Sequence, residues 1–413
     1  MSPGFAVNAG RLATNWQTLS TFRDIDQPGW TRRPFTDEYR AARRWLKEQM
    51  QAAGLSTEVD AGGNLIGRRP GSAPGLPSIL IGSHMDTVLG GGRFDGIVGV
   101  LGAIEVARSL AEQDVQLRRS LEVIDFLAEE PTDFGISTVG SRALVGSLSS
   151  EMLNRESNGR TLAEAIESVG GRPQAIGLCG RQPGSVALYL ELHIEQGPVL
   201  EQEQLRLGVV TSITGICRYR VELVGRADHA GTMPMARRRD ALAAAAECIV
   251  AVERLWQDGG GVGTTGRALI EPDATNVIPG RVELWVEQRS VDPDRLQERC
   301  GLFVEQVQSI ASRRDVAVRA DPLSYEAPVP VPDALQALLA DVLTEVGQSV
   351  RYLPSYAGHD ANQLARVAPV GMLFVPSHAG RSHCPEEWTD LADVALGAQA
   401  LGLAVIRADG LMS

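Results

Sequence analysis

Histidine and carboxylate side chains follow two short apolar runs of the sequence, SILIGS (78–83) and LEVIDFLA (121–128). Such runs are typical of buried strands, and open α/β sheets bind ligands at the carboxyl ends of their strands. We therefore expect the polar side chains at and between these two ends to meet at one site. They are His84, Asp86, Asp95, Glu129 and Glu130.

Two histidines farther along the chain extend this set, His193 in ELHIEQGP and His383 in RSHCPEEW. One bridging carboxylate and two further ligands for each ion make five ligands, which suits a pair of divalent ions about 3.5–4 Å apart. One more carboxylate is then free to act as a base. A lone histidine at a strand end is more often a structural hydrogen-bonding residue, but here four of the six histidines lie in motif-like settings: His84, His193, His229 and His383. The joint pattern favours a metal centre.

The elements that must position these residues alternate in type through the first half of the chain. Amphipathic or apolar helices are expected at about 37–53 and 97–110, with the two apolar strands between and after them. Thr36 suits the N-cap of the first helix and Gly54 suits its end. Strands that alternate with helices predict a mostly parallel or mixed sheet with helices on both faces.

The middle of the chain predicts a different order, strand-helix-strand-strand-helix-strand, which is the ferredoxin-like pattern. The expected segments are 217–227, 240–256, 266–271, 281–290, 293–313 and 316–320. We therefore predict an inserted domain over 212–326, within a catalytic domain made of 1–211 and 327–413.

Composition narrows the class of partner. The net charge of −12 argues against nucleic acid and anionic membrane surfaces, since both favour a basic protein face. The chain shows no apolar stretch of about eighteen uncharged residues and no secretory signal pattern. Its five cysteines are scattered and odd in number, which fits free thiols in a reducing cytoplasm.

Four motifs make the sequence recognisable: ELHIEQGPVLE, ADHAGTMPM, TNVIPG and AGHDA. From GWTRRPFTDEYRAARRWL near the start to SHCPEEWT near the end, the chain resembles the amidase family of N-carbamoyl-L-amino-acid hydrolases, β-ureidopropionases and allantoate amidohydrolases. The resemblance implies a two-metal aminopeptidase-like catalytic domain with an inserted ferredoxin-like dimerisation or lid domain. It also implies a homodimer.

The resemblance further implies two metal sites that share one carboxylate. Asp95 would hold one ion together with His84 and His193. Asp95 would hold the second ion together with Glu130 and His383. Zinc is the first expectation, and manganese, cobalt and nickel also suit such ligands.

The remaining roles that the resemblance implies concern proton transfer and substrate binding. Glu129 would be the general base, Asp86 would orient His84, and His229 would stabilise the developing oxyanion. The substrate contacts would be Gln196, Asn276, Arg289, Gly358 and His359.

Two of these residues keep a structural alternative. Asn276 precedes a turn and could bond its own backbone, and Arg289 could make only a surface ion pair. The sequence also departs from the family beside the base, where Pro131, Thr132 and Asp133 replace a run with glycine and often arginine, and again at His378-Ala379.

We expect a hydrolase that cleaves a linear C–N bond, most simply in an N-carbamoyl-L-amino acid or a related ureido acid that carries a carboxylate. An N-acyl amino acid deacylase or a dipeptidase is the alternative enzyme, because the same centre cleaves peptide bonds. A catalytically silent metal- or ligand-binding protein on the same scaffold is the alternative from another class.

Overall fold

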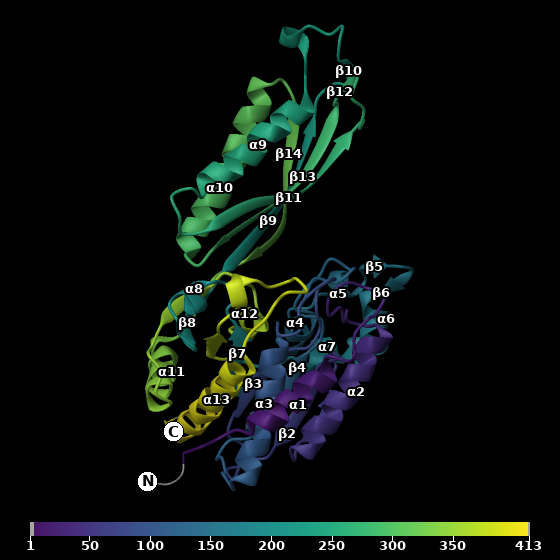
Figure 1. Cartoon of the computed structure of the whole chain (residues 1–413). Helices are drawn as coiled ribbons and strands as arrows, with labels where there is room; N and C mark the ends of the chain where they lie inside the picture. Colours follow the sequence, from purple (N-terminus) through teal and green to yellow (C-terminus); the bar gives the residue numbers. More distant parts are fainter. Residues whose placement is uncertain (1–3, 412–413) are drawn as a thin grey trace. The chain divides into compact units, whose positions relative to one another are not determined.

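The computed structural model describes residues 4–411, which divide into two compact units (Figure 1). The first unit consists of the chain up to Thr211, of Val331–Leu353 and of the chain from His359 onward. The second unit consists of Ser212–Pro330 and Pro354–Gly358.

The first unit is built on a nine-stranded mixed sheet with the order β1-β2-β4-β3-β7-β17-β8-β15, and β16 pairs with β8. The bounds of the second unit take in only β15 and the last two residues of β8 and of β16 from this sheet. Its central strands β4, β3, β7 and β17 run parallel, and every residue of them is buried. Such continuous burial is expected where helices cover both faces of a sheet. The strands are β1 (Ser56–Val59), β2 (Leu65–Arg69), β3 (Ser78–His84), β4 (Leu121–Phe126), β7 (Val186–Ile194), β8 (Gly208–Ile213), β15 (Val329–Pro330), β16 (Tyr352–Ser355) and β17 (Val370–Val375).

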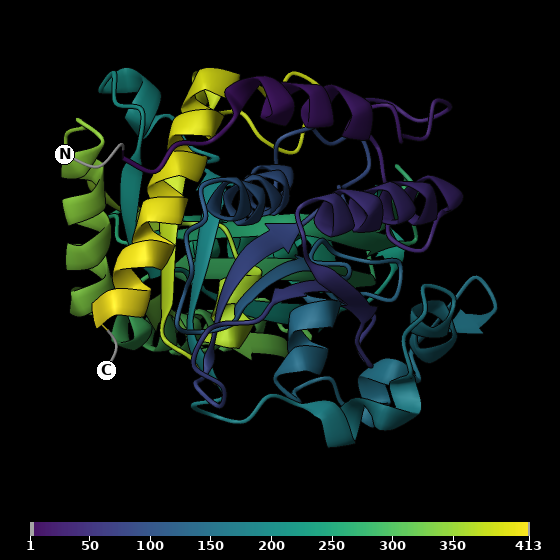
Figure 2. The same ribbon diagram turned by 90° about the horizontal axis from the view of Figure 1, so that it is seen from below.

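Helices lie on both sides of this sheet, with α3 and α13 on one side and α4 on the other (Figure 2). A hairpin of β5 (Glu156–Ser157) and β6 (Arg160–Thr161) and the 3-10 turns η1 (Pro173–Ala175) and η3 (His378–Gly380) lie in the connections. The helices are α1 (Ala9–Leu19), α2 (Asp37–Ala52), α3 (Ile97–Glu112), α4 (Val139–Leu144), α5 (Ser150–Leu153), α6 (Leu162–Glu167), α7 (Ile176–Cys179), α8 (Val199–Gln202), α11 (Asp333–Glu345), α12 (Asp360–Leu364) and α13 (Leu391–Leu411).

Local chemistry sets where these elements begin and end. The Thr36 side chain caps α2 by accepting from the backbone N–H of Tyr39, and Gly54 follows the helix with φ +81°. The strand predicted over 121–128 ends at Phe126 instead, because Ala128 turns the chain with φ +51°. The predicted α/β fold class is confirmed.

The last helix, α13, is long and apolar enough by length and composition to cross a membrane. In this structure 61% of its apolar window is buried, and it packs against α3, α1, α11, β7 and β17. That burial is what a core helix of a globular unit shows.

The second unit is an antiparallel four-stranded sheet with the order β11-β13-β9-β14, and α9 and α10 pack against it. A short pair of strands, β10 and β12, and the turn η2 (Met235–Arg237) complete it. The elements are β9 (Gly215–Val224), β10 (Asp228–His229), α9 (Ala241–Leu255), β11 (Val262–Glu271), β12 (Val277–Ile278), β13 (Arg281–Ser290), α10 (Pro293–Arg313) and β14 (Ala317–Glu326).

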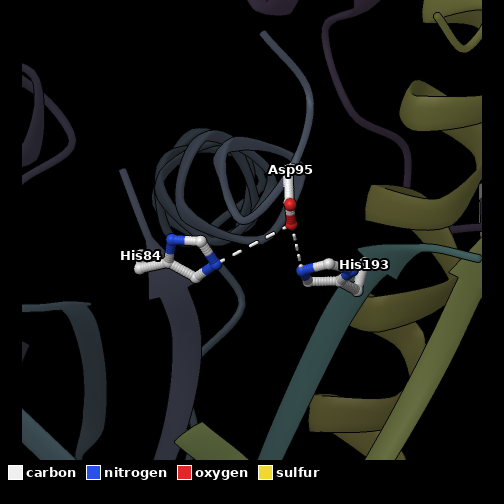
Figure 3. A group of neighbouring side chains, drawn as sticks. All are labelled: His84, Asp95 and His193. Atoms are coloured by element: carbon white, nitrogen blue, oxygen red, sulfur yellow. Dashed lines mark ion pairs between the residues drawn. The ribbon is translucent and has the colours of Figure 1, made fainter. Parts of the chain in front are cut away.

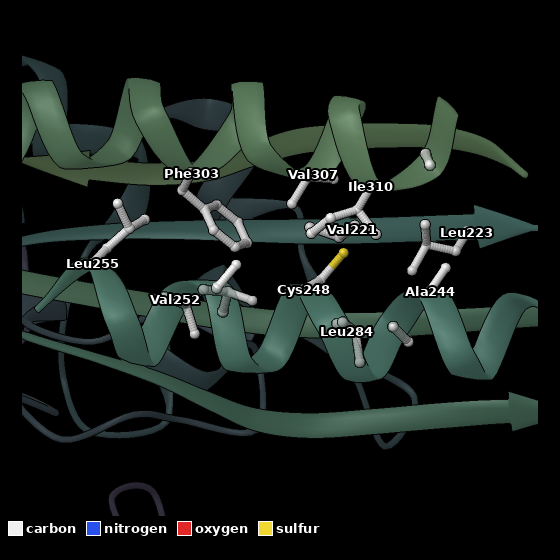
Figure 4. Packing of buried hydrophobic residues seen from close by; sticks show 14 of the residues in the cluster. Val221, Leu223, Ala244, Cys248, Val252, Leu255, Leu284, Phe303, Val307 and Ile310 are labelled. Atoms are coloured by element: carbon white, nitrogen blue, oxygen red, sulfur yellow. The ribbon is translucent and has the colours of Figure 1, made fainter. Parts of the chain in front are cut away.

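The core of this unit lies between the sheet and the two helices (Figure 4). Val221 and Leu284 from the sheet meet Cys248 of α9 and Phe303 and Val307 of α10, all of them fully buried. The edge strands β11 and β14 are longer than predicted, because none of their residues is buried and no apolar pattern marks their ends.

Candidate metal centre

Two neighbouring parallel strands and one helix start bring the first group of predicted ligands together (Figure 3). His84 is the last residue of β3, His193 lies near the end of β7, and Asp95 lies just before α3. Gly96 makes this approach possible, since a Cβ atom there would lie 2.4 Å from His84 Nε2.

In this first group both imidazoles turn Nε2 toward the same carboxylate oxygen. Asp95 Oδ1 is 3.1 Å from His193 Nε2 and 3.9 Å from His84 Nε2. The opposite ring nitrogens face backbone carbonyls, with His84 Nδ1 3.1 Å from the oxygen of Asp86 and His193 Nδ1 2.9 Å from that of Ile194. A ring that donates from Nδ1 presents its Nε2 lone pair to a metal ion.

The second group uses the other oxygen of the same aspartate. Asp95 Oδ2 is 3.0 Å from His383 Nε2, which is also 3.1 Å from Glu130 Oε1. Within each of the two groups the ligand atoms lie within 4.8 Å of one another. One carboxylate whose two oxygens serve two ligand groups has the arrangement of a bridge between two ions.

The electrostatics of the two ligand groups fit positively charged ions. Hydrogen bonds with Asp95 and Glu130 raise the pKa of His383 to about 11. Burial lowers the pKa of His193, but the hydrogen bond with Asp95 and the charges of Asp95 and Glu191 together outweigh burial and raise that pKa to about 9. The carboxylates of both groups thus favour positive charge at this place, as divalent cations would supply it. The donor set fits divalent metal ions.

Glu129, the predicted base, lies beside this centre without being part of either group. Its Oε2 is 3.7 Å from His84 Nε2, and burial together with the charge of Glu130 raises its pKa well above the ordinary value. A carboxylate with a raised pKa in a buried site is suited to take up a proton.

The Asp86 carboxylate makes contacts beyond the orientation of His84 that the family resemblance implied. Its carboxylate oxygens accept the backbone N–H groups of Glu129 (3.2 Å) and Glu130 (3.1 Å). The carboxylate is 3.7 Å from His84 Nδ1, so the close contact with that ring comes from the Asp86 carbonyl. Asp86 therefore fixes the backbone of the base and of one ligand, and burial raises its own pKa to about 7.

Two of the predicted substrate contacts lie in the same unit as the ligands. Gln196 Nε2 donates to Asp95 Oδ2 at 3.0 Å and to Ser382 Oγ at 3.1 Å. The ring of His359 is buried, and its centroid is 4.6 Å from that of His193. Gln196 is thus bonded directly to the shared carboxylate.

The other predicted substrate contacts, and the predicted oxyanion residue, belong to the second unit. His229 and Asn276 lie close together there, since β10 pairs with β12 and the N–H of Ala230 donates to the Asn276 carbonyl at 3.0 Å. His229 is exposed, and its Nδ1 accepts the N–H of Gly231 at 3.0 Å. Gly358 lies in the short second segment of this unit.

Arg289 makes the ion pair that the sequence left open as an alternative. Its Nε donates to Glu287 Oε1 at 2.7 Å, and its Nη1 donates to the carbonyl of Tyr356 at 3.0 Å. The guanidinium keeps further N–H donors, so this pairing and a substrate contact are compatible.

Sequence reasoning missed several buried carboxylates around the centre. Glu191 accepts from Ser83 Oγ (2.6 Å) and from the Tyr189 hydroxyl (2.9 Å), and it forms a third possible ligand group with His193 and His359. Both Glu191 oxygens are thus engaged by hydroxyl groups. A carboxylate within the apolar strand VALYLELHI was the pattern that could have revealed it.

The residues at both departures from the family pattern make local contacts. Asp133 pairs with Arg33 at 2.7 Å, which ties the segment after the base to the N-terminal part of the unit. His378 Nδ1 lies 2.7 Å from Glu201 Oε1, and the N–H of Ala379 donates to the same carboxylate.

Comparison with known proteins agrees with this geometry. The family model described as peptidase family M20/M25/M40 matches residues 80–407. The chain is 39% identical to an N-carbamoyl-L-amino acid amidohydrolase of Geobacillus stearothermophilus over 94% of this chain and 96% of the relative. It is 37% identical to a ureidoglycolate hydrolase of Arabidopsis thaliana over 98% of this chain and 88% of the relative. The solved structure of AtUAH in complex with glyoxylate superposes with a TM-score of 0.88 at 36% identity, covering 98% of this chain and 99% of that one.

Proposed function

The chain belongs to peptidase family M20/M25/M40, and from that premise we propose that it is a metal-dependent amidohydrolase of ureido acids. Its first expected substrate is an N-carbamoyl-L-amino acid. The observation that carries the proposal is the pair of ligand groups that share Asp95, with Glu129 beside them. The relatives named N-carbamoyl-L-amino acid amidohydrolase and ureidoglycolate hydrolase support the substrate class.

We propose two divalent ions per chain, zinc first, with manganese, cobalt or nickel also suited to these ligands. His84 and His193 would hold one ion, Glu130 and His383 the other, and Asp95 both. Bound there, such ions activate water and polarise the carbonyl oxygen of the substrate.

The chain's own residues then move the proton. Glu129 takes a proton from the attacking water as the water oxygen bonds to the ureido carbon. It returns this proton to the amino-acid nitrogen as the bond between that nitrogen and the ureido carbon breaks. Asp86 keeps Glu129 and Glu130 in register through their backbone N–H groups. The products are the free amino acid and a carbamate, which yields ammonia and carbon dioxide.

The second unit, predicted from the sequence as residues 212–326, is the proposed dimerisation or lid domain, and residues 1–211 and 327–413 are the proposed catalytic domain. His229, Asn276, Arg289 and Gly358 remain proposed contacts to the substrate. The proposed homodimer would form through β11, an edge strand that is mostly exposed and has one neighbour in its sheet. The scattered cysteines support a cytoplasmic location.

The test is hydrolysis of a substrate panel by metal-loaded protein. N-carbamoyl-L-amino acids, allantoate, ureidopropionate, ureidoglycolate, N-acyl amino acids and dipeptides would be compared by kcat/KM. We expect ureido acids to have the highest kcat/KM values. Preference for acyl amino acids or dipeptides would favour the alternative enzyme. Stoichiometric metal binding without turnover of any compound would favour the silent binding protein.

A further inference from the structure

A buried glutamate of the C-terminal loop contacts the backbone beside the shared ligand. Glu387 is 3% exposed, and its Oε1 accepts the N–H of Phe94 at 2.8 Å and that of Asp95 at 3.0 Å. One carboxylate oxygen thus binds two consecutive N–H groups of the loop that leads into α3. Charge-assisted bonds of this kind are stronger than those between neutral groups.

The same glutamate closes a ring of hydrogen bonds that begins and ends at Asp95. Ser382 Oγ donates to Glu387 Oε2 at 2.8 Å. Gln196 Nε2 donates both to Ser382 Oγ at 3.1 Å and to Asp95 Oδ2 at 3.0 Å. The Asp95 side chain and the Asp95 backbone are therefore held from opposite ends of one network.

Packing holds the two loops together at the same place. A Cβ atom on Gly92 would lie 2.2 Å from Glu387 Oε1, so the close approach requires glycine there. Next to Glu387, the Trp388 ring meets the Phe94 ring edge-on with centroids 5.3 Å apart. The guanidinium carbon of Arg93 lies 4.9 Å from the Trp388 ring centroid.

These contacts affect the two ligand groups unequally. The second group takes Asp95 from one of the joined loops and His383 from the other, four residues before Glu387. The first group takes only Asp95 from these loops, because His84 and His193 lie on strands of the sheet.

We propose that Glu387 is a positioning residue which joins the Asp95 loop to the His383 loop and thereby sets the affinity of the second metal site. The inference rests on the proposed function, because it assumes that the two ligand groups bind metal ions. Hydrogen-bond partners of metal ligands commonly change metal affinity by about 10- to 100-fold when they are removed.

The experiment is a titration of the full-length metal-free protein with Co²⁺, with bound ions counted by equilibrium dialysis and followed by their visible absorption. We expect Glu387→Ala to weaken the second ion by about 10- to 100-fold and the first ion by less. Glu387→Gln keeps an oxygen for the two N–H groups but loses the negative charge, so it should recover part of the lost affinity. His383→Ala identifies which binding step belongs to the second site.

Glu386→Ala is the matched control, because Glu386 is adjacent in the same loop but exposed and paired with Arg381. It should bind both ions as the unchanged protein does. If Glu387→Ala does not fold, Gly92→Ala serves instead, since its Cβ would displace the Glu387 carboxylate.

Three results would overturn the inference: unchanged binding of both ions by folded Glu387→Ala, equal losses in Glu387→Ala and Glu387→Gln, or the same loss in Glu386→Ala. If the unchanged protein itself fails to bind two ions, the proposed function fails. If it binds two ions and the Glu387 variants do so equally well, only the positioning role fails.

Discussion

The two units of this protein differ in which groups balance the charge of their carboxylates. On the sheet of the second unit, carboxylates pair with arginines along the surface, as in Arg218–Glu287 and Arg281–Glu222, each at 2.7 Å. At the carboxyl ends of the central strands of the first unit, carboxylates are buried and face imidazoles or one another. Glu130 and Asp95 do so around His383. One unit carries its own counter-charges. Within residues 4–411, the ligand groups of the other unit have no arginine or lysine partner, and they fit cations from outside because isolated buried carboxylates are costly.

The strongest test of this contrast is the replacement of one buried glutamate. Glu129→Gln should keep the fold and both metal ions and lose at least about 10²-fold in kcat, as expected for a positioned acid–base group. Glu222→Gln on the surface of the second unit is the control and should leave kcat unchanged. Near-normal turnover by the Glu129 variant would show that another residue is the base.

Removal of Arg289 tests whether a charge of the second unit serves the substrate as well as its ion pair. Arg289→Ala should lower kcat/KM by about 10²-fold for substrates with a carboxylate, the loss of a charge-assisted pair. Steady-state kinetics on a matched neutral amide analogue provide the comparison. An equal loss on that analogue would assign Arg289 a structural role with Glu287.

The stability of the two units should also depend on pH in opposite directions. His193 and His383 have pKa values raised to about 9 and about 11 in the metal-free chain. Their contribution to stability is complete below the unfolded value near 6.5 and is lost as pH rises through the folded values. The thermal unfolding temperature of the metal-free protein should therefore fall as pH rises into the alkaline range. Metal loading should remove that dependence on pH.

The second unit should instead weaken in acid. Burial raises the pKa of Glu287, but Arg289 and Arg218 outweigh burial and lower it below the ordinary 4.5. Its contribution is present above the unfolded pKa and lost as pH falls through the folded one. Hydrogen exchange of the β13 amides at acidic pH, with and without metal, would show this loss of stability.

A loss of stability at alkaline pH that persists after metal loading would contradict the assignment of His193 and His383 as metal ligands.

The smallest effect is expected from the surface ion pairs themselves. Arg281 pairs with Glu222, Glu271 and Glu283, and its side chain is 36% exposed. Exposed pairs contribute about 0–1 kcal/mol, so Glu222→Gln should change the free energy of unfolding by no more than about 1 kcal/mol. Denaturant titration measures this value. A loss of several kcal/mol would mean that these ion pairs contribute much more to stability than exposed pairs do.

The sequence predicted the parts of the fold in which burial leaves a pattern. The strands before His84 and Glu129 are buried throughout and mostly apolar, and the family resemblance, the fold class and the hydrolase class are confirmed. Strands β11 and β14 were predicted too short, since exposed edge strands carry no apolar run. The assigned roles of the ligand residues remain predictions, although the structure brings all five ligands into two groups.

What the sequence did not predict are contacts between side chains and distant backbone. Glu386 and Glu387 are neighbours of the same type, and only the fold shows that one is exposed and the other accepts N–H groups of Phe94 and Asp95. Likewise the motif around Gln196 indicates a pocket, but its bond to Asp95 depends on how two loops meet. Such pairs are far apart in the chain, and their spacing follows no period.

The most direct test of the central claim is the position of bound metal in crystals of the loaded protein, measured by anomalous scattering. Two peaks about 3.5–4 Å apart, one near each oxygen of Asp95, are predicted. One peak would lie among His84, His193 and Asp95, and the other among Glu130, His383 and Asp95. A single peak held by Glu191, His193 and His359, or no peak in active protein, would contradict the account.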